Sequence, residues 1–138
     1  MKRLILIVSV FLSSLTYSQN LDYGTKLDGV EKEDKIYDEV EENPEFPGGN
    51  AYLYKYLAED IKYPEMAKEN GIQGKVFVQF VVWKDGTIRD VKVVKGVHKT
   101  LDNEALRVVK EMPKWKPGKQ DGKAVNARFT MPIKFRIS

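Results

Sequence analysis

One stretch near the middle of the chain, KVFVQFVVW at residues 75–83, decides the fold. In an extended strand its apolar residues fall on both faces, because successive side chains point to opposite sides. One face carries Val76, Val78, Phe80 and Val82, and the other carries Phe77, Val81 and Trp83. Burial on both faces is typical of a strand inside a sheet. The stretch therefore predicts a central strand.

A hairpin is predicted directly after this strand. The sequence KDGT at residues 84–87 contains an Asp-Gly pair, which tolerates the positive φ angles that tight turns require. A second strand follows over 87–95. Its apolar positions change parity between Ile88 and Val91, which predicts a β-bulge near residues 89–90.

The last strand is predicted over 125–137, where apolar and polar residues alternate without interruption. The apolar positions run from Val125 to Ile137 in steps of two. Pro132 falls on the polar face and has no backbone N–H to donate to a ladder. Proline inside a strand indicates an edge position, so this strand is expected at the edge of the sheet.

Three helices are predicted around these strands. The first, over 50–60, carries apolar residues at four-residue spacing. The second, over 64–70, begins with Pro64 at its first position and is ended by Gly71. The third, over 101–112, places its apolar residues at i, i+4, i+7, i+8 and i+11, which is one helical face.

The resulting order is helix, helix, strand, strand, helix, strand. This order predicts an α+β domain of two layers, in which the helices pack on one face of a three-stranded antiparallel sheet. If the third helix runs back along the sheet, the last strand lies beside the first. The expected strand order is therefore second, first, third.

The N-terminal segment, residues 1–18, has the layout of a secretory signal peptide. Lys2 and Arg3 form a positive start, residues 4–15 are mostly apolar, and small residues precede a cleavage point after Ser18. The apolar run is shorter than the roughly 20 residues that span a bilayer. Cleavage is expected, and an uncleaved membrane anchor is the alternative.

Charge is distributed unevenly along the rest of the chain. Residues 19–42 carry a net charge of −6, whereas residues 43–138 carry +7. Residues 19–42 also lack a sustained apolar period, which predicts a flexible acidic leader before a domain over 43–138. The alternative is that the acidic leader folds back on the basic domain.

The chain lacks most of the side chains that catalysis would use. It has no cysteine and one histidine, His98, and four of its five serines precede residue 19. A thiol nucleophile, a zinc–thiolate site and a Ser-His pair are therefore excluded. His98 is interpreted as an exposed loop residue. The composition favours a binding module that is not an enzyme and that holds no metal or cofactor.

Several motifs of the domain resemble the C-terminal domain of TonB proteins. They are YPEMA at 63–67, GIQG at 71–74, DG at 85–86, LDNEA at 101–105, MPKWKPG at 112–118 and PIKF at 132–135. The FPGG sequence at 46–49 is similar to variants common in Bacteroidota-type bacteria. The resemblance spans residues 44–138.

The resemblance implies a periplasmic module that supports energy-dependent transport across the outer membrane. It implies binding of the TonB box, at the N-terminus of TonB-dependent outer-membrane receptors, as an added strand at the sheet edge. Family members also have a membrane-spanning helix coupled to a proton-driven motor, and a long proline-rich spacer. This chain departs from that pattern, because it has a signal-like segment and no proline in residues 19–42.

Two further arrangements stay open. If residues 1–18 are retained, the protein is a short energy transducer, anchored in the inner membrane and facing the periplasm. The motor proteins of that membrane are then additional partners. A homodimer is also compatible with the sequence, whereas nucleic acid is not an expected partner of an exported protein.

The candidate binding site lies along the edge of the last strand. Unpaired N–H and C=O groups of an edge strand can bind a partner strand with little dependence on sequence. Contact is expected over 124–131, because Pro132 interrupts the ladder. Polar and basic residues in or near this region would favour an acidic peptide, and the alternative is a solvated basic face. They are Asn126, Arg128, Thr130, Lys114 and Lys116.

Overall fold

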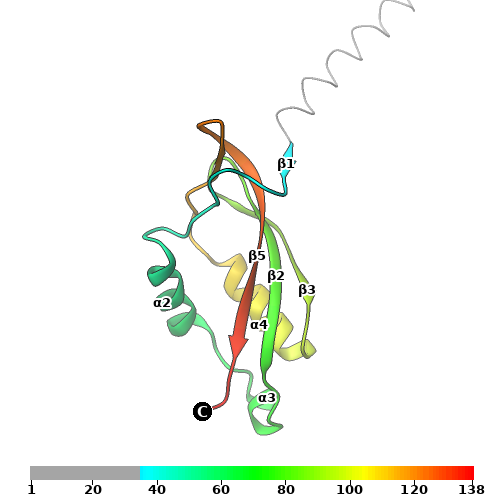
Figure 1. Cartoon of the computed structure of the whole chain (residues 1–138). Helices are drawn as coiled ribbons and strands as arrows, with labels where there is room; N and C mark the ends of the chain where they lie inside the picture. The colour runs from blue at the N-terminus through cyan, green and yellow to red at the C-terminus, as the bar shows by residue number, and fades with distance from the viewer. Residues whose placement is uncertain (1–34) are drawn as a thin grey trace, which may run out of the picture. The chain divides into compact units, whose positions relative to one another are not determined.

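The described part of the chain, residues 35–138 of a computed structural model, contains three helices and five strands. The predicted signal peptide and the first part of the leader, up to residue 34, lie outside the described residues. The elements of Figure 1 are β1 (Ile36–Tyr37), α2 (Asn50–Asp60), α3 (Glu65–Glu69), β2 (Gly74–Val82), β3 (Ile88–Lys95), α4 (Lys99–Lys110), β4 (Gly118–Gln120) and β5 (Lys123–Phe135). Within residues 35–138, no helix combines the length and the apolarity needed to cross a membrane.

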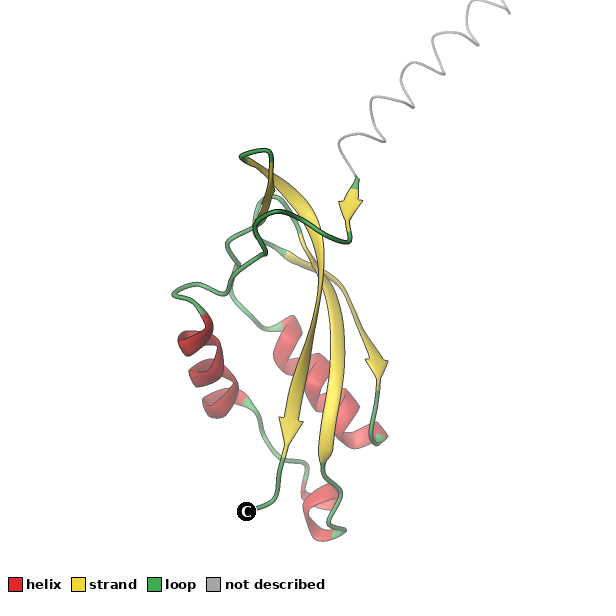
Figure 2. Cartoon of the chain, viewed as in Figure 1, coloured by secondary structure: helices red, strands yellow, loops and turns green. Residues whose placement is uncertain are grey.

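The three predicted strands form the body of the sheet in the predicted order, with β2 between β3 and β5 (Figure 2). Both pairings of β2 are antiparallel. Two short strands enlarge the expected three-stranded sheet: β4 pairs with β5, and β1 pairs with β5 in parallel. The sheet is therefore mixed. The sequence did not predict β1, because this strand comes from the predicted leader and is too short to produce an apolar period.

The turn and the bulge predicted around β3 are both present. The register between β2 and β3 shifts by one residue after Gln79, and Asp90 has a φ of 52°. Gly86 has a φ of 91° in the hairpin turn, where a Cβ would lie 2.4 Å from the backbone oxygen of Trp115. Glycine is required there by both its conformation and its surroundings.

The core lies between one face of the sheet and the helices. Val76, Val78, Phe80 and Val82 of β2 are buried in it, together with Leu101, Ala105, Val108 and Val109 of α4 and Met131, Ile133 and Phe135 of β5. Trp115 stands against the ring of Phe80 with a centroid distance of 5.3 Å and an edge-on geometry. Phe46 and Phe129 also contact Trp115, at 5.8 and 5.6 Å. The α+β class and the one-sided helix layer follow the prediction.

The start of α4 differs from the sequence-based expectation for His98. His98 is half-buried and caps the helix, with its Nδ1 accepting from the backbone N–H of Thr100 at 3.2 Å. An imidazole nitrogen here satisfies one of the N–H groups that a helix start leaves without a partner. The prediction of an exposed loop residue was wrong, because the helix begins two residues earlier than its apolar period.

Candidate peptide-binding edge of the sheet

β5 is the strand on which the candidate site depends. It pairs with β2 from Ala127 to Phe135, and with β1 at Asn126 and Ala127. Between Arg128 and Phe135, β2 is the one strand neighbour of β5 among the described residues. We call the free side of β5 over 128–135 the open edge.

The direction of the backbone groups on the open edge follows from Pro132. Pro132 stands opposite Phe77 of β2 and has no N–H, so it belongs where the nitrogen faces away from the neighbouring strand. In an antiparallel ladder this direction alternates along the strand. The N–H groups of Arg128, Thr130 and Lys134 therefore point toward the open edge. Their register supplies donors at every second residue, with a gap at Pro132.

The N-terminal part of β5 is already paired with residues of the predicted leader. Ile36 pairs in parallel with Asn126, and Tyr37 pairs with Ala127. Asp38 then forms an ion pair with Arg128. For residues 36–38 the structure therefore shows the fold-back alternative in place of a flexible leader.

The leader continues along β4 and the hairpin between β4 and β5. Glu42 exchanges two backbone hydrogen bonds with Lys119, at 3.1 and 2.9 Å. The Glu41 carboxylate accepts from the backbone N–H of Asp121 at 2.6 Å, and the backbone N–H of Glu41 donates to Gln120 Oε1 at 3.0 Å. Hydrogen bonds therefore hold residues 41–42 against β4 and the residue that follows it, and apolar patterning does not detect such contacts.

Asn126 is a structural residue, which corrects its predicted outward position. It is 2% exposed, and its Oδ1 accepts from the backbone N–H of Lys84 at 2.8 Å. β2 ends at Val82, opposite Ala127, so the chain that leaves the ladder needs an acceptor for its next N–H groups. Asn126 supplies that acceptor, and its side chain is not available to a partner.

The other four predicted residues are distributed over separate places. Arg128 is engaged with Asp38 and lies at the start of the open edge. Thr130 is exposed on the open edge, where its Oγ1 accepts from Gln79 Nε2 at 3.3 Å. Lys114 and Lys116 are exposed but precede β4; the backbone of Lys116 pairs with Glu45 at 2.8 and 2.9 Å. Thr130 is thus the predicted residue that lies on the open edge without a contact to the described part of the leader.

A groove lies beside the C-terminal half of the open edge, and the sequence did not predict it. It has a volume of about 530 Å³ and lies between α2 and the end of β5. Its walls are Tyr54, Leu57, Ala58, Ile61, Tyr63, Lys75, Pro132, Lys134, Phe135 and Arg136. The sequence contains one indication of this groove, because Tyr54 falls beside the apolar stripe of its helix. The apolar periods of α2 and β5 do not show that the two elements lie next to each other. In residues 35–138 no three His, Asp or Glu side chains are grouped to hold a metal ion.

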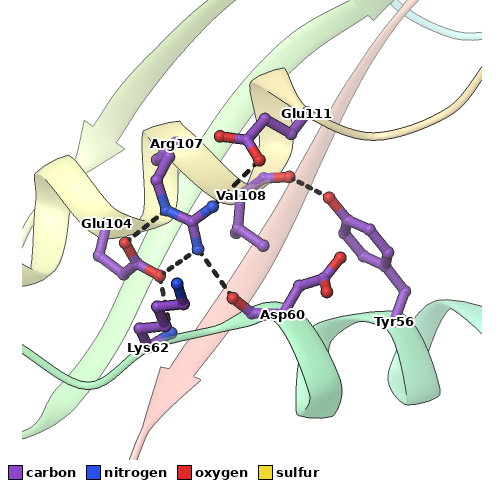
Figure 3. A network of polar contacts seen from close by, with 7 residues as sticks. All are labelled: Tyr56, Asp60, Lys62, Glu104, Arg107, Val108 and Glu111. Atoms are coloured by element: carbon purple, nitrogen blue, oxygen red, sulfur yellow. Dashed lines mark hydrogen bonds and ion pairs between the residues drawn. The ribbon is translucent and has the colours of Figure 1, made fainter.

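α2 is held in place by polar contacts with α4, shown in Figure 3. The Tyr56 hydroxyl donates to the backbone oxygen of Val108 at 2.7 Å, and Arg107 Nη2 donates to the backbone oxygen of Asp60 at 2.7 Å. The backbone N–H of Lys62 donates to Glu104 Oε2 at 2.7 Å. These contacts join the last turns of α2 to α4 and so fix the wall of the groove.

Arg107 is the centre of this network. Its Nε and Nη2 donate to the two oxygens of Glu104 at 2.8 and 2.7 Å, and its Nη1 donates to Glu111 at 3.1 Å (Figure 3). These hydrogen bonds lower the pKa of Glu104, because they favour its charged form. Burial raises the pKa of Tyr56, so this phenol stays protonated and keeps its donor role.

Comparison with known proteins identifies a family for most of the domain. Residues 59–137 match the model of the Gram-negative bacterial TonB protein C-terminal family. Protein TonB of Helicobacter pylori strain J99 is 38% identical over 69 residues, which are 46% of this chain and 25% of that protein. Protein TonB of Pseudomonas aeruginosa is 35% identical over 77 residues, which are 54% of this chain and 22% of that protein. The alignment thus covers about a quarter of these curated relatives.

Solved structures with similarity to this chain come from the same two organisms. A solution structure of the Helicobacter pylori TonB C-terminal domain has a TM-score of 0.49 and 26% identity, and covers 62% of this chain and 78% of that chain. A solution structure of the Pseudomonas aeruginosa TonB C-terminal domain has a TM-score of 0.40 and 29% identity, and covers 56% and 80%.

Proposed function

The chain belongs to the Gram-negative bacterial TonB protein C-terminal family, and we propose that it is a non-enzymatic binding module for N-terminal segments of outer-membrane receptors. In this role it supports energy-dependent transport across the outer membrane. The receptor segment adds to the sheet as an extra strand. The partner is a protein segment, and no cofactor takes part.

The observation that carries the proposal is the open edge of β5. Over 128–135 its backbone has one strand neighbour in the described part of the chain, so every second residue presents groups that a further strand can bind. Main-chain hydrogen bonds supply affinity in this mode of recognition, and side-chain contacts supply selectivity.

The proposed contact lies further along β5 than the sequence suggested. Residues 126–127 are occupied by β1, so the receptor segment is assigned to 128–135 in place of 124–131. The parallel pairing of β1 supports the proposal, because it is a short extended segment that this strand accepts. Asp38 beside Arg128 is likewise an acidic residue of the kind expected in the partner.

The proposal places the module in the periplasm after removal of residues 1–18. Mass spectrometry of the native protein should then find Gln19 as the first residue. An intact Met1 in the inner-membrane fraction would contradict this placement. That outcome would favour the anchored transducer, with the motor proteins as additional partners.

An NMR titration of the mature chain with a peptide from a receptor N-terminus tests the binding mode. We expect the amide shifts of 128–135 to change, together with those of the facing residues of β2. Shifts confined to α3 or to the loop over 96–98, with 128–135 unchanged, would contradict strand addition at this edge.

A further inference from the structure

The groove beside the open edge points to a specific chemistry for the bound segment. We propose that α2 and the end of β5 together select a segment in which apolar and acidic residues alternate. The apolar side chains face α2, and the acidic side chains face a basic group formed by Lys75, Lys134 and Arg136. This inference rests on the proposed strand addition. It states that the groove determines which segments bind.

The alternation follows from where the groove lies relative to β5. Phe135 lines it from the core face of the strand, whereas Pro132 and Lys134 line it from the opposite face. A groove reached from both faces lies at the edge of the strand itself. A segment added there has side chains that alternate between the two faces, so neighbouring residues meet different walls.

The wall on the core side is apolar. α2 contributes Leu57 and Ala58, and Ile61 follows at the end of the helix. Tyr54 stands at the rim, where 66% of the residue is left exposed by the described part of the chain. Apolar surface of this kind next to polar residues is typical of binding grooves. The hydrogen bonds of Tyr56 with Val108 of α4, and of Asp60 with Arg107 of α4, hold this wall in place before a partner arrives. A preformed wall lowers the entropic cost of binding an apolar side chain.

The wall on the other side is basic. Lys75 and Lys134 stand opposite each other in the β2–β5 register and therefore point to the same face, and Arg136 follows Lys134 by two residues. All three are exposed, and none forms an ion pair with any of the described residues. Of the described residues that line the groove, none is acidic. This uncompensated charge favours a segment that carries carboxylates.

Most of the apolar wall lies outside the region that matches the family model. The family match begins at residue 59, whereas α2 spans Asn50–Asp60. The open edge belongs to the matched region, whereas Tyr54, Leu57 and Ala58 of the apolar wall precede it and Ile61 lies within it. In the proposed mode, strand addition uses the matched region and the choice of segment depends mainly on α2.

The experiment uses the mature chain and a synthetic probe, acetyl-Val-Glu-Val-Asp-Val-amide. Two control peptides change one property each: Gln and Asn replace the acidic residues in one, and Ser replaces the valines in the other. We expect the probe to shift the amides of 128–135 and of α2, and both controls to bind more weakly. Binding of the uncharged control should be nearly independent of salt, whereas binding of the probe should weaken as salt screens the basic wall.

Two pairs of protein variants separate the walls. Ala58→Trp fills the groove, and Ala51→Trp is the matched control on the same helix, also exposed but outside the groove. We expect Ala58→Trp to weaken binding of the probe about tenfold, the usual effect of losing one buried aliphatic side chain. Ala51→Trp should leave binding unchanged.

The second pair of variants tests the basic wall. One double variant replaces Lys134 and Arg136 by Gln, and the control double variant replaces Lys92 and Lys99 by Gln. The first double variant should lose most of the salt dependence, and the second should keep it. If Ala58→Trp and the first double variant bind the probe as the parent does, while the amides of 128–135 still shift, the groove inference is overturned and strand addition stands. If a receptor segment binds at 128–135 and the probe does not, the assigned chemistry is overturned.

Discussion

Asp38 and Arg128, 90 positions apart in the sequence, form an ion pair at the point where β1 ends and the open edge of β5 begins. Both side chains are partly exposed, so the pair contributes less than about 1 kcal/mol to stability. The main effect of the ion pair is to position Asp38. It holds an acidic residue of the protein's own leader against the first side chain that a bound segment would meet.

Asp38→Asn should therefore change binding more than folding. With Arg128 released, an acidic receptor segment is expected to associate faster at low salt, and the gain should disappear at high salt. Rapid-mixing fluorescence with a labelled peptide measures the rate. Glu39→Gln is the control, because Glu39 is exposed and forms no ion pair with the described residues. Equal rates for both variants would show that Asp38 does not compete.

Truncation of the leader should have an effect that depends on where it ends. Removal of residues 19–34 leaves the contacts of β1 and of Glu42 in place, so the free energy of unfolding should change little. Removal of residues 19–42 eliminates the two backbone bonds with Lys119 and the pairing of β1. We expect a loss of at least about 1–3 kcal/mol, since the two bonds with Lys119 alone contribute about 0.5–1.5 kcal/mol each. Denaturant unfolding that finds both truncations alike would contradict the docked position of residues 36–42.

Phe80→Ala should destabilise the domain strongly. Phe80 is fully buried and contacts the rings of Trp115 and Phe129. Truncation of a buried phenylalanine typically costs about 3–5 kcal/mol. Phe77→Ala on the opposite face is the control, because that ring is half-buried beneath Lys95 and should lose less. Chemical denaturation of both variants gives the comparison, and an effect below about 1 kcal/mol for Phe80 would refute its central place.

The pH dependence of stability should reflect Glu104. Its hydrogen bonds with Arg107 lower the pKa of Glu104 in the folded protein. The resulting stabilisation is complete above the ordinary glutamate pKa of about 4.3 and is lost as pH falls through the lower folded value. Glu104→Gln should therefore flatten the decline in stability below about pH 5, measured by urea unfolding at several pH values. The control Glu59→Gln should keep the parent slope, as Glu59 is exposed on α2. A parent-like slope in Glu104→Gln would show that the pair is not maintained in solution.

The open edge predicts a difference between two substitutions of Thr130. Thr130→Pro removes an N–H that points away from β2, so folding should survive while strand addition is weakened. Thr130→Ala keeps that N–H and should bind a receptor peptide nearly as the parent does. Calorimetric titration measures both affinities, and thermal unfolding checks the fold. Unfolding of the domain by Thr130→Pro would contradict this direction of the N–H. The amides of Phe129 and Met131 would then point toward the open edge, and their hydrogen exchange would be rapid.

Local patterning was sufficient for the regular elements of the domain. The two apolar faces of 75–83 predicted a central strand, and β2 lies between β3 and β5. The parity change after Ile88 predicted the bulge, and Asp90 has the positive φ that such a bulge allows. Pro132 predicted an edge strand, which is correct for residues 128–135 but not for 123–127, where β4 and β1 pair with β5. Each of these predictions rests on the period of one element or the chemistry of one residue.

The sequence by itself determined the class, the strand order of the three long strands and the absence of thiol chemistry. Only the tertiary structure decided which part of the edge is free. β1 spans two residues, too few for a period to appear, and it is held by a strand that begins 86 positions after it ends. The side chain of Asn126 is held inside by the backbone N–H of Lys84, which follows the end of β2. The groove depends on the hydrogen bonds of Tyr56 and Asp60 of α2 with Val108 and Arg107 of α4. These contacts join residues far apart in the chain through hydrogen bonds and charges, which leave no periodic signal in the sequence of either partner.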